Sequence, residues 1–235
     1  MSKSEFRKES RNDSYEESHE DKIKRMHAQY ELLCEEIPNP KCALNFSNPF
    51  ELLVATVLSA QTTDKRVNSV TPELFATFPG AYALANAPIS RVENIIRPLG
   101  FYKVKAQHLV TLSAQIVEKF NGNVPSDMKN LISLSGVGRK TANVVLGNAF
   151  HIPGFPVDTH VIRVTGRLRW RSNWNDDKSK VSPELIEREI TSCFDKKDWT
   201  DLSHRLILHG RNICKAVNPK CDSCPLRFTC PYVNM

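Results

Sequence analysis

Four cysteines close to the C-terminal end restrict the fold of this chain more than any other feature. Cys214, Cys221, Cys224 and Cys230 follow the spacing C-x6-C-x2-C-x5-C, with no histidine between them. Four thiols within seventeen residues are better explained as ligands of one metal centre than as separate core residues. Zinc ribbons usually contain two C-x2-C pairs, whereas this segment contains one, so the pattern favours a 4Fe-4S cluster held by loops.

The remainder of the sequence predicts an all-α fold. Apolar residues recur at spacings of three and four from Lys22 onward, whereas alternating runs of β-branched residues are nearly absent. Residues typical of a helix N-terminus stand at Asn48, Ser90, Asp158 and Ser182, each ahead of an amphipathic segment. About ten short helices are therefore expected.

Charge is unevenly distributed along the 235 residues, whose formal net charge is +6. Residues 1–21 contain few large apolar side chains and many charges of both signs, so we expect a disordered tail there. The chain after position 22 holds 27 basic and 19 acidic residues, a net charge of +8. A positive body favours a polyanionic partner such as nucleic acid.

No segment of the sequence predicts a membrane span or an export signal. The longest apolar runs, such as residues 52–58, are much shorter than a bilayer requires, and charges stand where a signal peptide needs apolar residues. We expect a cytoplasmic protein with no membrane partner, associated with the nucleoid if the source is bacterial. Seven cysteines without an export signal also disfavour a disulfide framework.

The segment Gly136-Val137-Gly138 joins two helical patterns and predicts a hairpin between helices. Its two glycines allow a tight turn and a close approach of the backbone to a ligand. The next helix begins Arg139-Lys140-Thr141, and the N–H groups of its first turn would bind a phosphate without reading sequence. A nucleotide-binding P-loop is excluded because Arg139 separates the second glycine from Lys140. An ordinary turn between two helices remains the alternative.

Lys140 and Asp158 are the candidate catalytic residues. Lys140 lies at a helix start, where the positive end of the helix dipole disfavours an ammonium, and an uncharged amine can attack carbon. Asp158 follows a proline-rich loop and is a natural N-cap, yet its carboxylate could also face the same cleft. The simpler alternatives are a solvated surface lysine and a purely structural cap.

Basic residues surround the cysteines. Lys215, Lys220 and Arg227 lie within the segment of the four thiols, and Arg211 lies just before it. A loop of this charge is typical of a surface that contacts phosphates.

The hairpin, Lys140, Asp158 and the four cysteines together resemble the endonuclease III family of helix-hairpin-helix DNA glycosylases. The resemblance runs from about Lys22 to Pro231, and its most specific segments are residues 58–64, 136–146, 157–160 and 206–211. It implies two lobes with a DNA cleft between them. One, here called the hairpin lobe, would contain six helices within residues 42–152. The other, the cysteine lobe, would join residues 22–41 to residues 153–235.

The resemblance also implies roles for individual residues. Lys140 would be the nucleophile and Asp158 the catalytic carboxylate. Gln61 would fill the gap left by the displaced base, and Phe101 stands where relatives often carry leucine as a second inserted side chain. Ser135 replaces the usual proline of the hairpin.

The implied activity is that of a bifunctional DNA glycosylase and AP lyase of base excision repair. Such an enzyme removes oxidised pyrimidines from double-stranded DNA through a lysine Schiff base and cleaves 3′ to the lesion, or to an abasic site, by β-elimination. We expect it to act as a monomer with a 4Fe-4S cluster. Two alternatives are an adenine-type glycosylase, which would lack the lysine found at position 140, and a non-catalytic DNA-binding or electron-transfer iron-sulfur protein.

Overall fold

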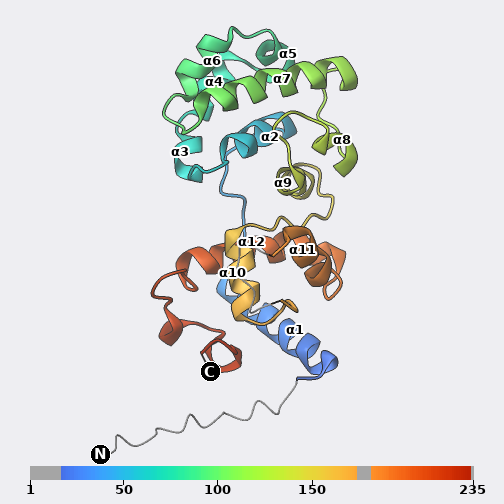
Figure 1. Cartoon of the computed structure of the whole chain (residues 1–235), viewed down its shortest axis with the longest axis vertical. Coiled ribbons are helices and arrows are strands. Elements are labelled where there is room, and N and C mark those ends of the chain that lie inside the picture. Colours follow the sequence, from blue (N-terminus) through green and yellow to red (C-terminus); the bar gives the residue numbers. More distant parts are fainter. Residues whose placement is uncertain (1–16, 174–180, 234–235) are drawn as a thin grey trace, which may run out of the picture.

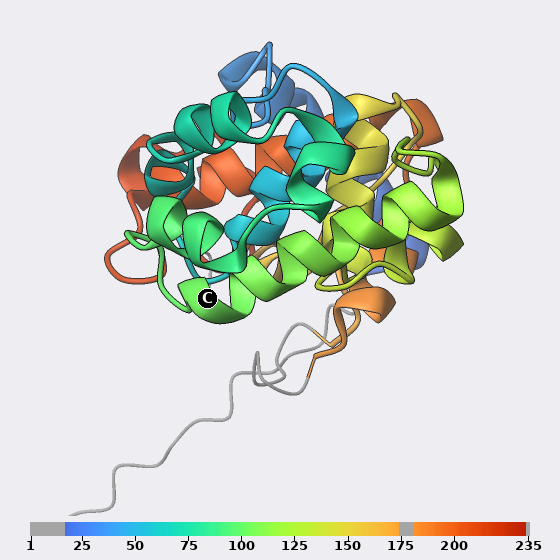
Figure 2. The ribbon, with the colours of Figure 1, turned by 90° about the horizontal axis from the view of Figure 1, so that it is seen from above.

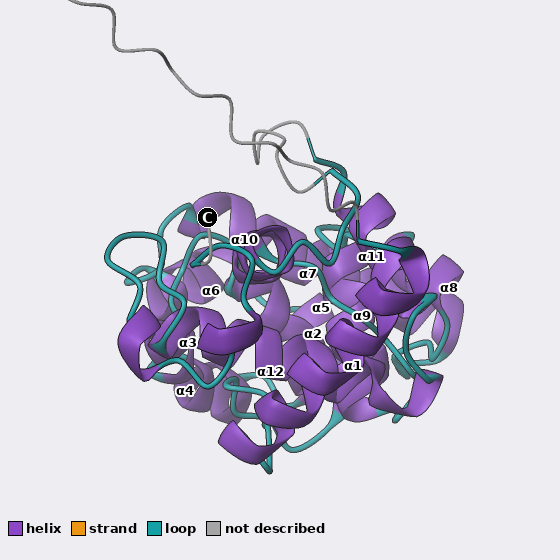
Figure 3. Cartoon of the chain, turned by 90° about the horizontal axis from the view of Figure 1, so that it is seen from below, coloured by secondary structure: helices purple, strands orange, loops and turns teal. Residues whose placement is uncertain are grey.

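The computed structural model describes residues 17–173 and 181–233, and all of its regular elements are helices (Figure 3). The prediction of an all-α fold is therefore confirmed for the described residues. The α-helices are α1 (His19–Glu36), α2 (Pro49–Leu58), α3 (Asp64–Asn68), α4 (Thr71–Thr77), α5 (Gly80–Ala85), α6 (Ile89–Ile96), α7 (Tyr102–Phe120), α8 (Met128–Ile132), α9 (Arg139–Ala149), α10 (Thr159–Arg167), α11 (Pro183–Thr191) and α12 (Trp199–Asn212). Short 3-10 turns lie at η2 (Lys196–Asp198), η3 (Cys221–Ser223) and η4 (Arg227–Thr229).

The helices form two bodies stacked along the long axis of the molecule (Figure 1). One cluster of buried hydrophobic residues lies between positions 44 and 146 and is built by α2 to α9. A second cluster combines positions 26–33 of α1 with positions 155–230. These two cores support the proposed division into a hairpin lobe (residues 42–152) and a cysteine lobe (22–41 with 153–235).

The hairpin lobe contains eight helices rather than the six that the resemblance implied. Four of them, α3, α4, α5 and α8, have only five to seven residues. Helices this short cannot display a full turn-by-turn apolar stripe, so periodicity alone does not resolve them.

Helix α1 begins at His19, so residues 19–21 belong to its first turn and not to the tail. The Ser18 hydroxyl accepts a hydrogen bond from the N–H of Asp21 at 3.1 Å and caps the helix. Polar and acidic residues are favoured at such a position, which explains why composition suggested a tail there. Glu17 and Ser18 are described as well, and the carboxylate of Glu17 accepts a hydrogen bond from Nε of Arg25 at 2.7 Å. Residues 1–16 of the predicted tail lie outside the described residues.

Three of the four predicted helix starts are confirmed. Asn48, Asp158 and Ser182 each accept a hydrogen bond from a backbone N–H of the following first turn. The prediction at Ser90 is wrong, because α6 begins at Ile89 and its N-cap is Pro88, two residues before Ser90. The Pro88 carbonyl accepts from the N–H groups of Arg91 and Val92, at 2.9 and 3.3 Å.

Helix α7 is the longest helix of the described residues and crosses the hairpin lobe (Figure 2). Its N-cap Phe101 and its C-cap Asn121 both have left-handed backbone conformations. Its buried face packs on α5, α6 and α2. Among the described residues, no helix combines the length and the apolar character needed to cross a membrane.

Candidate active site

The hairpin predicted from the glycines lies between α8 and α9. Gly136 has a φ of +76°, and a Cβ atom there would lie 2.9 Å from Cγ of His108. Position 136 therefore requires glycine both for its backbone conformation and for space. Gly138 caps α9 and has free space around it, so its lack of a side chain leaves the backbone open to a ligand.

Two side chains of helix α7 form hydrogen bonds with the hairpin. The N–H of Ser135 donates to Oε1 of Gln115 at 2.8 Å, and the Ser135 hydroxyl lies 2.9 Å from Nδ1 of His108. A proline at position 135 could make neither bond, since it has no N–H and no hydroxyl. Two side-chain contacts thus fix this turn at the position where the resemblance to the family implied proline.

The hairpin residues predicted to bind DNA differ in whether they have a free hydrogen-bond donor. Val137 is buried, and its N–H donates to the carbonyl of Leu134 at 3.1 Å, so it offers no free donor. The guanidinium of Arg139 makes a two-bond ion pair with Glu187 of α11, at 2.7 and 2.9 Å. The first-turn N–H groups of α9, including that of Thr141, remain the feature suited to a phosphate.

Lys140 and Asp158 line the same cavity, which lies between the lobes and has a volume of about 80 Å³. Lys140 is the second residue of α9 and is exposed. Other walls come from α12, through His204 and Arg211. The fold therefore brings an amine and a carboxylate from different lobes to one opening.

Asp158 is both a cap and a cavity residue. Its Oδ1 accepts hydrogen bonds from the N–H groups of His160 and Val161, at 2.8 and 2.9 Å. Both capping bonds use the same oxygen, so Oδ2 is outside the cap. The structural and the catalytic interpretations of Asp158 are therefore compatible.

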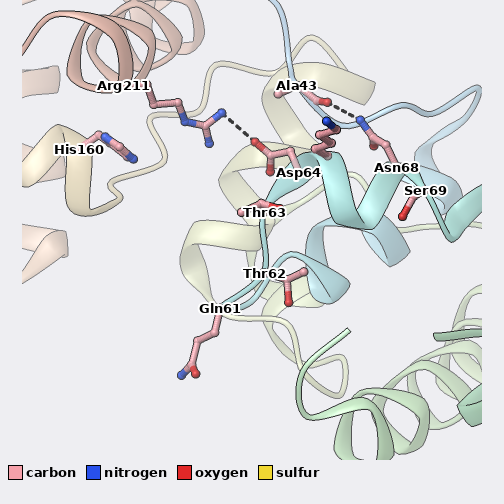
Figure 4. Close-up of a pocket in the computed structure, with 10 residues that line it drawn as sticks. Ala43, Gln61, Thr62, Thr63, Asp64, Asn68, Ser69, His160 and Arg211 are labelled. Carbon is pink, nitrogen blue, oxygen red and sulfur yellow. Dashed lines mark hydrogen bonds and ion pairs between the residues drawn. The ribbon is translucent and has the colours of Figure 1, made fainter. Parts of the chain in front are cut away.

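A larger cavity of about 940 Å³ adjoins the first (Figure 4). The side chains of His160 and Arg211 reach it from the cysteine lobe, and Gln61 and Asp64 reach it from the hairpin lobe. Nη1 of Arg211 lies 2.8 Å from Oδ2 of Asp64, forming an ion pair across the lobes. Burial lowers the pKa of His160, which favours the neutral imidazole.

The pairing of Asp64 with Arg211 was not predicted from the sequence. Arg211 was grouped with the basic cysteine loop because it precedes Cys214 by three positions. In the structure Arg211 lies in the last turn of α12, and its guanidinium pairs with Asp64 at the start of α3. The sequence contained one indication of a shared site, because both residues lie in segments that resemble the family.

Gln61 and Phe101 also come together in space. Both side chains line a third cavity, of about 250 Å³, next to Gly136 of the hairpin. Gln61 is exposed, and Phe101 is 67% exposed despite its large aromatic ring. Both residues have left-handed backbone conformations, with φ of +53° and +57°. An exposed aromatic side chain on a constrained backbone is suited to insertion into another molecule.

The four cysteines line one pocket of the cysteine lobe, together with Val164 of α10, His209 of α12 and mostly apolar residues of the adjoining loops. Burial raises the pKa of the Cys224 thiol to about 11, and burial also raises that of Cys230. In the described part of the chain, no group of three His, Cys, Asp or Glu side chains is close enough to hold a single metal ion. The all-thiol donor set in an apolar pocket fits a cluster, in which each cysteine binds a different iron atom. Lys215 and Lys220 are exposed on the surrounding loop.

Comparison with known proteins assigns the family. Residues 54–189 match the HhH-GPD superfamily of base excision DNA repair proteins. The endonuclease III of Synechocystis sp. is 44% identical over 195 residues, which cover 83% of this chain and 86% of the relative. The endonuclease III of Escherichia coli strain K12 is 40% identical over 200 residues, covering 85% of this chain and 92% of the relative.

Solved structures agree with the relatives. A non-covalent complex of endonuclease III with DNA superimposes with a TM-score of 0.81 at 40% identity, covering 89% of this chain and 96% of the other. A trapped covalent intermediate of endonuclease III with DNA gives the same score and identity and covers 97% of that chain. The chain belongs to the endonuclease III family of helix-hairpin-helix base excision DNA repair proteins.

Proposed function

We propose that this protein removes oxidised pyrimidines from double-stranded DNA and cleaves the resulting abasic site through a Schiff base on Lys140. One observation carries the proposal. The Lys140 amine and the Asp158 carboxylate, on different helices and in different lobes, line a single cavity. This pair is what a glycosylase with lyase activity needs, and a DNA-binding or electron-transfer protein has no use for it. The hairpin lysine likewise disfavours an adenine-type glycosylase.

The chemistry follows from these two groups. A base must leave the stack to be reached, and a lesion that stacks or pairs poorly leaves at lower cost. As the glycosidic bond breaks, positive charge develops on the sugar, and the nearby Asp158 carboxylate stabilises it. The Lys140 amine forms a bond to C1′, the departing base takes the electron pair of the glycosidic bond, and the amine loses a proton.

Strand cleavage uses the same lysine. The C1′–O4′ bond of the sugar then breaks as the nitrogen lone pair forms an iminium between Lys140 and C1′, and O4′ takes the electron pair and a proton. The iminium acidifies the C2′ proton. Removal of that proton forms a C1′–C2′ enamine system whose electrons expel the phosphate at C3′ as the C3′–O bond breaks. Water then releases the lysine. The break falls 3′ to the lesion.

DNA would be held by several separate features. The first-turn N–H groups of α9, from Gly138 to Thr141, suit a phosphate, and Lys215 and Lys220 would contact further phosphates. Gln61 and Phe101 would enter the space left by the displaced base. Arg139 would contact DNA only if it left Glu187, since its guanidinium is already paired.

Cys214, Cys221, Cys224 and Cys230 would hold a 4Fe-4S cluster. Such a cluster, when bound, supplies a rigid link between four points of the C-terminal loop. The protein itself contributes Arg167, whose Nη1 donates to Sγ of Cys214 at 3.3 Å and to the carbonyl of Lys215 at 2.7 Å. The loop that carries the two exposed lysines is thereby fixed to α10. We propose further that the protein acts as a monomer on DNA containing damaged bases or abasic sites.

Borohydride trapping tests the proposal. The protein is mixed with a duplex containing an abasic site or thymine glycol, and borohydride is added during the reaction. The reduced iminium should appear as a stable protein–DNA adduct with the wild type, and Lys140→Gln should form none. Lys129→Gln is the matched control, because Lys129 is an exposed lysine on the other helix of the hairpin. An adduct formed by Lys140→Gln would refute the assignment.

A further inference from the structure

Lys105 connects the two segments proposed to enter DNA. It lies in the first turn of α7, and its backbone N–H donates to the carbonyl of Phe101 at 3.0 Å. Its Nζ donates to Oγ1 of Thr62 at 2.8 Å, next to Gln61 in the chain. A single residue thus bonds to the loop of Gln61 through its side chain and to Phe101 through its backbone.

The environment of Lys105 is unusual for a lysine. It is 5% exposed, and among the described residues no other lysine is buried. No carboxylate of the described chain lies within ion-pair distance of its Nζ. Burial lowers the pKa of Lys105, as expected for an ammonium with a neutral partner. Such burial opposes folding, so stability does not explain this placement.

The backbone on both sides of this contact needs support. Gln61 and Phe101 occupy the left-handed region, which is unfavourable for residues with a side chain. Conformations of this kind persist only where surrounding contacts hold them. Thr62 also bonds within its own loop, through its N–H to Ser59. The Lys105 ammonium adds the link from this loop to α7.

The two constrained segments meet at one place. Gln61, Phe101 and Lys105 line the same cavity of about 250 Å³, which also touches Gly136 of the hairpin. A shift of the Gln61 loop relative to α7 would therefore change the spacing of both exposed side chains. Both must fit the same gap in the base stack, so their spacing matters for displacing the base.

We propose that Lys105 is a positioning residue that keeps Gln61 and Phe101 in register, so that both side chains enter the base stack together as the target base leaves. The inference rests on the proposed function. It assigns Lys105 to base displacement and not to the chemistry at Lys140. Loss of the contact should therefore slow displacement of a stacked base far more than cleavage at a site that has no base.

The first experiment compares Lys105→Met with Lys103→Met. Lys103 is exposed and lies two residues earlier on the same helix, so its variant removes the same charge without the contact. A duplex with thymine glycol beside 2-aminopurine reports unstacking as a rise in fluorescence. Lys105→Met should slow that rise and base excision about 10-fold, and should slow cleavage of a preformed abasic site less than about 3-fold. Lys103→Met should match the wild type in both.

The second experiment removes the acceptor. Thr62→Val keeps the shape of the side chain but cannot bond to Lys105, whereas Thr62→Ser keeps the hydroxyl. Thr62→Val should slow the fluorescence rise like Lys105→Met, and Thr62→Ser should restore it. If Lys105→Met fails to fold, the two Thr62 variants still test whether the contact positions Gln61 and Phe101. Thr62 lies on a partly exposed loop, so these variants should fold.

Three results would overturn the inference. The first is wild-type fluorescence kinetics in both Lys105→Met and Thr62→Val. The second is equal slowing by Lys105→Met and Lys103→Met, and the third is equal slowing by Thr62→Val and Thr62→Ser. None of them affects the proposed function. Failure of the wild type to form a borohydride adduct would refute that function instead, so the two failures are distinguishable.

Discussion

Substitution of Asp158 should separate its two roles, because the structure assigns each role to a different part of the carboxylate. Both capping bonds end at Oδ1, and the amide oxygen of asparagine can accept them in the same way. Asp158→Asn loses only the interaction of the charge with the dipole of α10, about 0.5 kcal/mol. Asp158→Ala loses the cap as well, about 1.5 kcal/mol in total.

These free energies convert to measurable shifts. For a chain of this size, 1 kcal/mol changes the melting temperature by about 2–4 °C. Asp158→Asn should therefore melt about 1–2 °C below the wild type, and Asp158→Ala about 3–6 °C below it. Both variants lack the negative charge, so both should lose on the order of 100-fold in the single-turnover rate of thymine glycol excision.

Ser182→Ala provides the matched control for the cap. Ser182 accepts a hydrogen bond from the N–H of Leu185 at the start of α11, away from the cavity of Lys140. This variant should lose stability but keep the excision rate. Full activity of Asp158→Asn would refute the reasoning and direct the search for the carboxylate to Asp64. Equal destabilisation by asparagine and alanine would show that the side chain is not the cap.

Further predictions concern the hairpin, the DNA surface and the metal. Gly136→Ala should destabilise the fold by about 1–3 kcal/mol in urea unfolding, since its Cβ would meet His108 at a positive φ; wild-type stability would contradict this. DNA affinity should fall with a log-log salt slope of roughly −3 to −6, and Lys220→Ala should weaken all duplexes alike; a flat slope would count against phosphate clamping. Purified protein should contain about four irons per chain, and stoichiometric zinc without iron would exclude the cluster.

Much of the fold could be predicted because its signals are local. A cap involves residues three positions apart, and an apolar stripe repeats every three or four, so both are written in a short stretch of chain. The starts at Asn48, Asp158 and Ser182 are of this kind. The error at Ser90 is local too, since the pattern S-x-x-E also occurs inside a helix, and here α6 already begins at Ile89, after its N-cap Pro88.

The candidate site was only partly predictable. Lys140, Asp158 and the four cysteines were found because their residue types and spacing are unusual or because they resemble a family. The spacing of residues along the chain could not show that Lys140 and Asp158 share a cavity. Nor could it show that Gln61 and Phe101 lie together. Arg139 was predicted to contact DNA, yet the fold pairs it with Glu187, and no feature near either residue signals that pair.

The sequence by itself determined the helices, the glycine hairpin and the set of thiol donors, because each depends on neighbours within a few residues. Only the tertiary structure decided which distant side chains meet. The pairs Asp64 with Arg211, Arg139 with Glu187 and Lys105 with Thr62 join different elements. Their geometry depends on how whole helices and lobes pack, through buried contacts summed over two cores, and no local pattern encodes that sum.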